Sequence, residues 1–178
     1  MKPTLLAVLF VVASSLMAAT AQADPQPGAT FPAFAAHDIL GGTHQSQELS
    51  GHRTLVIAIT DRGASEVMAA WWAAAQQRVP SSVGRVSIVS IEFPEIAMGM
   101  ARSRARQRTQ PAARPHTWLD GNRQMAHALG LAPSTTPWVF VLDEHGRVVA
   151  TAHSAVDAPA ASAVWSAVVR NGTNVAGR

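Results

Sequence analysis

Short apolar runs rich in β-branched residues alternate with segments of helical periodicity, and this alternation limits the possible folds more than any other feature. The runs 54-TLVIAIT-60 and 85-RVSIVSIEF-93 are short and continuous, as expected for central strands covered on both faces. A helix is predicted after each of them, from about Ala64 to Gln77 and over 95–108. Strands that alternate with helices predict an α/β domain whose central sheet is flanked by helices.

Antiparallel hairpins are predicted at both ends of this unit. Residues 33–47 are typical of two short strands around a Gly41–Gly42 turn, and residues 135–153 of two strands joined by a tight turn at 143–146. The remaining predicted elements are a short strand and two helices, at 116–119, about 122–130, and about Ala158 to Arg170. Together these elements predict one domain over residues 33–172 with a central mixed sheet.

Residues 1–23 have the pattern of a secretory signal peptide. The only lysine of the chain precedes an apolar run over 4–20, and 21-AQA-23 is a small-x-small cleavage site. The pattern predicts export, to a bacterial periplasm, with no stable membrane span after cleavage; an uncleaved N-terminal anchor is the alternative. An extended Pro/Gly-rich arm is predicted over 24–32, and a flexible tail over 173–178.

The absence of cysteine restricts the chemistry of the 178-residue chain. Export would permit disulfides, but none can form, and thiolate nucleophiles, thiol redox chemistry and cysteine–metal sites are excluded. The formal net charge of +3 is too small to indicate binding to nucleic acid or to a membrane surface. The seven histidines form no H-x-x-x-H or H-E-x-x-H pair on a predicted helix, so neither a metal site nor a cofactor is predicted.

Three further features have competing interpretations. The run 102-RSRARQR-108 is typical of a solvated helix end, but it would also suit an acidic patch of a partner, an anionic lipid head group or nucleic acid. Met98 and Met100 could bind Cu(I) through their thioethers, although two methionines in one apolar helical turn are typical of core packing. At least one of Trp71 and Trp72 should lie in the core, and an exposed one would indicate a contact surface.

Two phrases of the sequence carry a family resemblance. The segment 28-GATFPAFAAHDILGGTHQSQELSGHRTLVIAIT-60 combines a G-x-x-x-P start, a glycine-turn hairpin, a Ser-Gly step and the first central strand. The segment 130-GLAPSTTPWVFVLDEHGRVV-149 combines a Thr-Pro before a strand with a D-x-x-G hairpin. Over nearly all of the mature chain, the sequence resembles exported thioredoxin-like proteins of the TlpA/ResA and redoxin type. The resemblance implies a three-layer sandwich with a mixed sheet flanked by helices and an N-terminal β-hairpin.

The resemblance places the W-C-x-x-C site of that family on residues 61–65, where both cysteines are missing. Asp61 stands at the tryptophan position, Arg62 and Ser65 at the two cysteines, and Gly63–Ala64 at the usual Gly-Pro. Because arginine and serine cannot exchange disulfides, disulfide oxidoreductase and cysteine peroxidase activity are not carried over. The residues leave three alternatives: local caps with Arg62 in water, a retained ligand- or partner-binding surface, or new catalysis.

The resemblance also singles out Thr136, Pro137 and Trp138. It implies a cis proline opposite the turn, preceded by Thr136 backbone that pairs with an extended peptide; a purely structural proline is the alternative. Trp138 lies beside this groove or in the core. The favoured function is an exported, redox-inactive module, with no catalytic residue, that binds an extended peptide or an envelope protein. A cysteine-independent enzyme or metal-handling protein, and a structural subunit of an envelope assembly, are the alternatives, and the oligomeric state is open.

Overall fold

The computed structural model describes residues 25–170, so the predicted signal peptide and the tail at 173–178 lie outside the described residues. The strands are β1 (Ala35–Asp38), β2 (Thr43–Gln45), β3 (Thr54–Ile59), β4 (Gly84–Ser90), β5 (Thr117–Asp120), β6 (Trp138–Leu142) and β7 (Val148–His153). The α-helices are α1 (Ser65–Arg78), α2 (Glu95–Arg108), α3 (Gln124–Leu129) and α4 (Ala161–Val169). Short 3-10 helices cover Ser46–Leu49, Arg62–Ala64 and Pro111–His116. No helix in this part of the chain is long and apolar enough to cross a membrane.

The strands form one mixed sheet in the order β2-β1-β5-β4-β3-β6-β7. β3, β4 and β5 are parallel, which requires crossover connections, and α1 and α2 lie in these connections. The two predicted hairpins add antiparallel strands at the two edges, where β6 pairs with β3 and β1 pairs with β5. The predicted order of strands and α-helices and the mixed α/β architecture are therefore confirmed.

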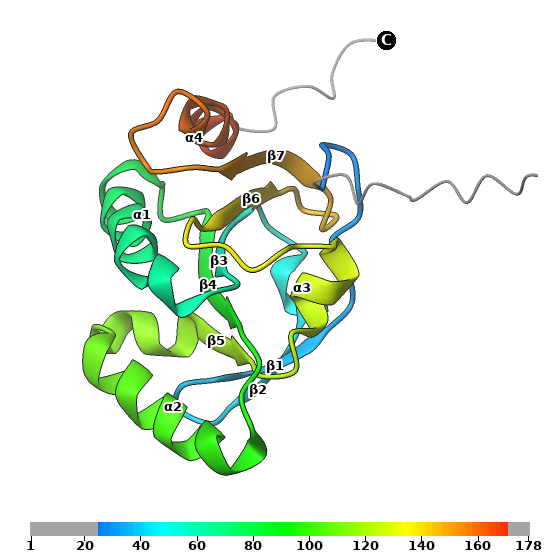
Figure 1. The fold of residues 1–178 in the computed structure, drawn as a ribbon. Coiled ribbons are helices and arrows are strands. Elements are labelled where there is room, and N and C mark those ends of the chain that lie inside the picture. The colour runs from blue at the N-terminus through cyan, green and yellow to red at the C-terminus, as the bar shows by residue number, and fades with distance from the viewer. Residues whose placement is uncertain (1–24, 171–178) are drawn as a thin grey trace, which may run out of the picture.

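The apolar residues of the central strand divide between the two faces of the sheet. Figure 1 shows α1 and α4 on one face and α3 on the other. Leu55 and Ile57 pack in the cluster under α1 and α4, and Val56 and Ala58 pack in the cluster that contains α3. All of β3 is buried, which explains why its sequence is a continuous apolar run.

The two adjacent tryptophans of α1 both contribute to the core. Trp71 is fully buried, and its Nε1 donates a hydrogen bond to the carbonyl of Ser154 at 2.9 Å. Trp72 is half-buried against the same cluster. The prediction that at least one lies in the core is confirmed, and neither provides an exposed aromatic contact surface.

The described part of the predicted N-terminal arm packs on the closing hairpin. The N–H of Gly28 donates to the carbonyl of Val148 at 2.7 Å, and Thr30 forms a β-bridge with Arg147. The Phe31 ring is buried, with its centroid 5.5 Å from that of Phe140 in an edge-to-face contact. The stretch contains a turn at Pro27–Gly28, where Gly28 has a positive φ, and it contributes Phe31 to the core.

Candidate functional site

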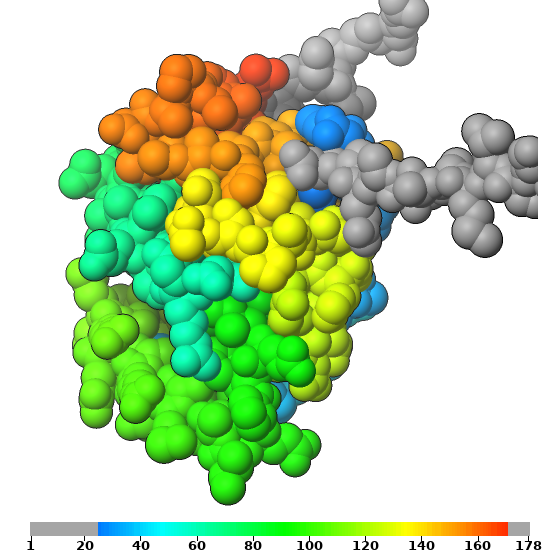
Figure 2. All heavy atoms as spheres, in the orientation of Figure 1, coloured from blue at the N-terminus to red at the C-terminus, as the bar shows by residue number. Residues whose placement is uncertain are grey.

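The three parallel strands end at the same edge of the sheet, and the candidate site lies there. The loops at 60–64, 91–94 and 121–123 follow β3, β4 and β5. Figure 2 shows the turn after β3, in teal, between the yellow loop around 130–137 and the green chain after β4. In open α/β sheets, ligands bind outside the carboxyl ends of the strands. We call this region the carboxyl edge.

The turn at 61–65 satisfies much of its own hydrogen bonding. Asp61 Oδ1 accepts a hydrogen bond from the N–H of Gly63 at 2.7 Å and so caps the 3-10 helix. Ser65 Oγ donates to the carbonyl of Arg62 at 2.7 Å. For Asp61 and Ser65, this is the local capping that the first alternative expected. Binding by these residues remains a prediction.

Arg62 makes a contact that the sequence does not predict. Its side chain is exposed, and its guanidinium carbon lies 5.1 Å from the centroid of the Phe93 ring. A cation over an aromatic face is attracted by the ring quadrupole. The contact therefore holds a positive charge beside the loop that follows β4.

The structure brings the two predicted halves of the site together. A Cβ atom on Gly63 would lie 2.9 Å from Cγ2 of Thr135, so the turn and the loop before Pro137 are in close contact. Thr60 Oγ1 donates to the carbonyl of Ala132 at 2.8 Å and accepts from the N–H of Ser134 at 3.1 Å. The end of β3 therefore fixes the position of this loop.

The prediction of a cis peptide bond before Pro137 is wrong. No cis peptide bond occurs within residues 25–170. Trans is the lower-energy isomer of an X–Pro bond by about 0.5–1 kcal/mol. In the trans form, a hydrogen bond to a side chain fixes the conformation of this loop. That bond runs from the N–H of Thr136 to Ser134 Oγ, at 3.0 Å. Because this donor is used inside the loop, the predicted pairing of Thr136 with an extended peptide would first have to break the bond.

Trp138 lies in the core, which was one of its two predicted places. Its side chain is 6% exposed and stacks on the ring of His153, with the centroids 3.8 Å apart. His153 Nε2 lies 2.8 Å from Ser134 Oγ, the arrangement of a nucleophile and its base. Within residues 25–170, however, no carboxylate hydrogen-bonds to His153. Ser134 Oγ also accepts the Thr136 N–H, and so the contacts favour a structural role for this pair.

A cleft of about 610 Å³ opens at the carboxyl edge beside Arg62. Its lining combines an apolar wall with polar side chains: Glu92, Phe93, Pro94, Asn122 and His127. The N–H of Phe93 donates to the carbonyl of Gly121 at 3.0 Å and joins the two loops that form the cleft. The volume is in the range of small-ligand sites. This cleft was not predicted from the sequence, although its residues follow two neighbouring predicted strands.

Asp120 positions the loop and the helix that carry Asn122 and His127. Its side chain is 1% exposed, and Oδ1 accepts from the N–H of Gln124 at 2.9 Å. Oδ2 accepts from the N–H of Met125 at 2.8 Å and from Ser90 Oγ at 2.6 Å. The carboxylate thereby caps α3 and ties β5 to β4.

Arg123, inside the same loop, has left-handed backbone with φ 55°. This conformation costs roughly 1–2 kcal/mol for a residue with a side chain. The hydrogen bonds of Asp120 to the first turn of α3 hold the chain around this residue.

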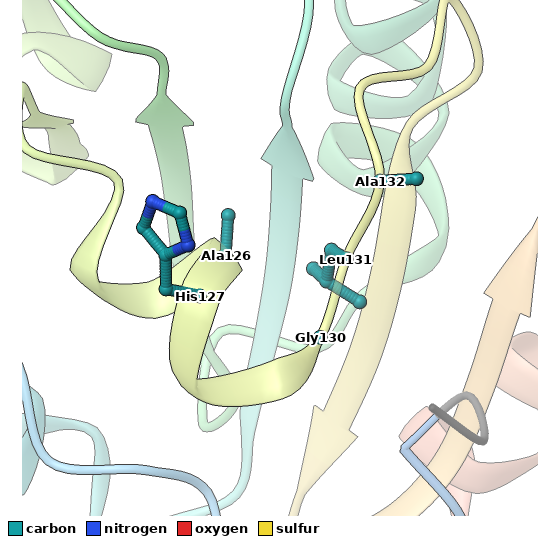
Figure 3. Close-up of a pocket in the computed structure, with 5 residues that line it drawn as sticks. All are labelled: Ala126, His127, Gly130, Leu131 and Ala132. Atoms are coloured by element: carbon teal, nitrogen blue, oxygen red, sulfur yellow. The ribbon is translucent and has the colours of Figure 1, made fainter. Parts of the chain in front are cut away.

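His127 also borders a smaller hollow of about 170 Å³, between α3 and the loop that follows it (Figure 3). Figure 3 shows His127 and Ala126 on the helix, and Leu131 and Ala132 on the loop that follows it. His127 is the only ionisable side chain in the lining of this hollow. In the larger cleft, Glu92 is ionisable as well. His127 is therefore the one residue that lines both hollows.

A cluster of ionisable groups lies away from the carboxyl edge, on the β1–β2 hairpin. His44 Nδ1 is 2.7 Å from Glu48 Oε2, and His44 Nε2 is 3.1 Å from Asp38 Oδ2. Burial opposes charge on the imidazole, but the hydrogen bonds to Glu48 and Asp38 raise the pKa of His44 above 6.5. Burial likewise opposes the charge of both carboxylates, but their hydrogen bonds, above all to His44, lower the pKa of Asp38 and of Glu48.

Metal ligands do not gather in the described part of the chain. No group of three or more histidine, aspartate or glutamate side chains within residues 25–170 could hold a metal ion. Met98 packs on the backbone of Gly121, where a Cβ atom would overlap its Cε, whereas Met100 is 59% exposed. The two thioethers therefore lie in different surroundings.

The fold is similar to solved thioredoxin-like structures. A candidate thiol-disulfide oxidoreductase from Bacteroides vulgatus aligns over 82% of this chain and 98% of its own, with a TM-score of 0.61 and 9% identity. The exposed lipoprotein thioredoxin of Streptococcus pneumoniae aligns over 76% and 98%, with a TM-score of 0.57 and 11% identity. A candidate thiol:disulfide interchange protein DsbE from Chlorobium tepidum aligns over 80% and 98%, with a TM-score of 0.53 and 15% identity.

These likenesses establish a thioredoxin-like fold, as the sequence resemblance implied. No family model matches the sequence, and no curated protein is similar to it in sequence. The fold therefore accommodates a carboxyl edge from which cysteine is absent.

Proposed function

We propose that this protein is an exported, redox-inactive binding module that holds a segment of a partner protein at the carboxyl edge of a thioredoxin-like sheet. The observation that carries the proposal is the open cleft of about 610 Å³ beside the exposed guanidinium of Arg62. Thiol–disulfide exchange proceeds through a thiolate, and the chain has none. The signal-peptide pattern of residues 1–23 supports export.

The lining of the cleft indicates what kind of segment it would take. Phe93 and Pro94 offer an apolar wall, while Glu92, Asn122 and His127 offer hydrogen-bonding groups. Such a combination of apolar surface with a few polar groups is typical of binding sites. Arg62 adds a positive charge at the rim, which would pair with a carboxylate of the partner. We therefore expect an extended segment with one apolar side chain next to an acidic group.

The proposed site is displaced from the peptide groove expected at Thr136. The N–H of Thr136 bonds to Ser134 Oγ, and Trp138 is buried under His153. Neither group is free to contact a partner while this loop keeps its hydrogen bonds. The cleft residues lie on the Phe93 side of Arg62, and the side chains of Asn122 and His127 are exposed.

Site-specific photo-crosslinking in the native envelope fraction tests the proposal. A photo-reactive side chain replaces Asn122 in the cleft, and in the control it replaces the exposed Arg147, which lies in the β6–β7 turn at the opposite edge of the sheet. We expect one partner captured from Asn122 and not from Arg147. The captured partner is then purified and its affinity measured by calorimetry for the original protein and for Arg62→Ala and His127→Ala.

Each substitution should weaken the affinity by about tenfold if the side chain is a main contact. Capture that is equally strong from both positions, or an affinity that neither substitution changes, would contradict binding in the cleft. A partner that contacts many distant surfaces would instead support a structural subunit. Turnover of a small molecule that requires Ser134 and His153 would support a cysteine-independent enzyme.

A further inference from the structure

Helix α2 is the one α-helix of the described chain without a buried residue. Its half-buried residues recur at helical spacing and define the face toward the domain: Ala97, Met98, Ala101, Arg102 and Ala105. Three of these are alanines, and Met98 packs on Gly121. A helix held by such a narrow face leaves most of its circumference exposed.

The outward ridge of α2 begins with two large apolar side chains. Ile96 is 90% exposed and Met100, one turn later, is 59% exposed. The exposed residues Ser103 and Gln107 continue the same line along the helix. Single exposed apolar residues are ordinary on protein surfaces, but these two adjoin and form a small continuous apolar surface.

Arginines flank this ridge on both sides. Helical geometry places Arg104 and Arg108 on one flank and Arg106 on the other, and all three are exposed. No ion pair within residues 25–170 involves an arginine. Glu95 is the only acidic residue of the helix. These positive charges are therefore available to an external anion.

We propose that α2 binds an anionic lipid bilayer, with Ile96 and Met100 entering the interface and the three flanking arginines contacting lipid phosphates. An interfacial helix can present apolar and cationic side chains to the same bilayer, and here the two apolar residues lie in the first turns of α2 while the arginines flank the ridge in its last turns. A protein groove would need anchors at successive turns, and here Ser103 and Gln107 follow the two apolar residues. Electrostatic attraction between arginines and an anionic lipid surface does not require a fixed arrangement of the charges. Arginines on both flanks of the ridge can therefore contribute to it.

Vesicle co-sedimentation tests this proposal. The protein is purified in the form that the cell produces after any processing. It is then mixed with vesicles of phosphatidylcholine alone or of equal parts phosphatidylcholine and phosphatidylglycerol. We expect binding to the anionic vesicles only, and a loss of binding in high salt, where surface charges are screened. Binding to neutral vesicles of equal strength would overturn the proposal.

Two variants and a matched control locate the binding surface. Replacing Arg104, Arg106 and Arg108 by glutamine should weaken binding by about 100-fold, and Ile96→Ser with Met100→Ser by about tenfold. The control replaces three exposed arginines on other elements by glutamine: Arg78, Arg147 and Arg170. It should change binding by about threefold at most, because those charges belong to other elements and do not flank the ridge. A control that loses as much as the α2 variant would overturn the proposal.

The vesicle-binding result does not depend on whether the cleft binds a partner. Arg62→Ala and His127→Ala should leave vesicle binding unchanged, and the α2 variants should leave crosslinking from Asn122 unchanged. If folded protein fails to bind anionic vesicles and a photo-reactive group at Ser103 captures an acidic protein instead, the lipid proposal is refuted.

Discussion

Replacing Asp120 by alanine tests whether one buried carboxylate builds the cleft side of the carboxyl edge. The substitution removes the acceptor of two backbone N–H groups of α3, those of Gln124 and Met125, and of the buried hydroxyl of Ser90. A hydrogen bond to a charged group contributes about 1.5–3 kcal/mol, and a buried donor left without a partner costs about 1–3 kcal/mol. Because α3 is short and its first turn can hydrate, we expect a loss of about 3–5 kcal/mol in the free energy of unfolding.

Urea denaturation followed by tryptophan fluorescence measures this loss, and Asp120→Asn is the matched control. The amide keeps the shape and one oxygen acceptor but places an NH₂ donor against another donor, so we expect an intermediate loss of about 2 kcal/mol. Hydrogen exchange at the amides of Gln124 and Met125 should accelerate in both variants. A loss below about 1 kcal/mol for Asp120→Ala, with unchanged exchange, would refute the role assigned to the carboxylate.

Three further predictions concern the turn, the strained loop residue and the hairpin cluster. Gly63→Ala should lower the free energy of unfolding by about 1–2 kcal/mol, because the new Cβ meets the Thr135 methyl group and Asp61 Oδ1, and Thr135→Ser should reduce this penalty in a double-mutant cycle. Arg123→Gly should leave stability unchanged or raise it by up to about 1 kcal/mol, because glycine relieves the left-handed strain, whereas Arg123→Val should lower it by at least about 1 kcal/mol in the same denaturation assay. The raised pKa of His44 means that its stabilisation is complete below the ordinary value of 6.5 and is lost as the pH rises through the raised pKa, so the stability difference between the original protein and His44→Gln should shrink on going to alkaline pH. The lowered pKa values of its two carboxylate partners have the opposite sign, so their stabilisation is lost on acidification, and a difference that grows at alkaline pH would contradict the assignment.

The sequence was sufficient to predict the sheet because its strands carry local signals. The run 54–60 is apolar from Leu55 to Ile59, and burial on both faces of the central strand follows directly from that pattern. The two hairpins were predictable from glycine turns, and Gly41 and Gly146 do have positive φ. The capping role of Asp61 was also a local inference, and the bond to Gly63 confirms it.

The cleft could not be predicted because its lining depends on strand pairing. The pairing of Ser90 with Asp120 in the parallel β4–β5 ladder brings Phe93 and Asn122 together across about 30 residues of chain. The Ser134–His153 pair likewise depends on the register of β6 and β7. The cis isomer predicted for Pro137 came from the resemblance alone, and no local pattern could reveal the hydrogen bond that shapes the loop before it.

The contrast between the two halves of the carboxyl edge bears on whether it still binds anything. On the Thr136 side, the groups that could contact a peptide are bonded to one another or buried, as in a surface with only a structural role. On the cleft side, a buried carboxylate and a strained Arg123 hold exposed side chains in place without burying them. Buried polar groups cost stability unless every partner is present, so an apolar core would stabilise a purely structural edge more simply. If the cleft serves binding, substitutions at Asn122 and His127 should leave the free energy of unfolding unchanged while they reduce partner capture.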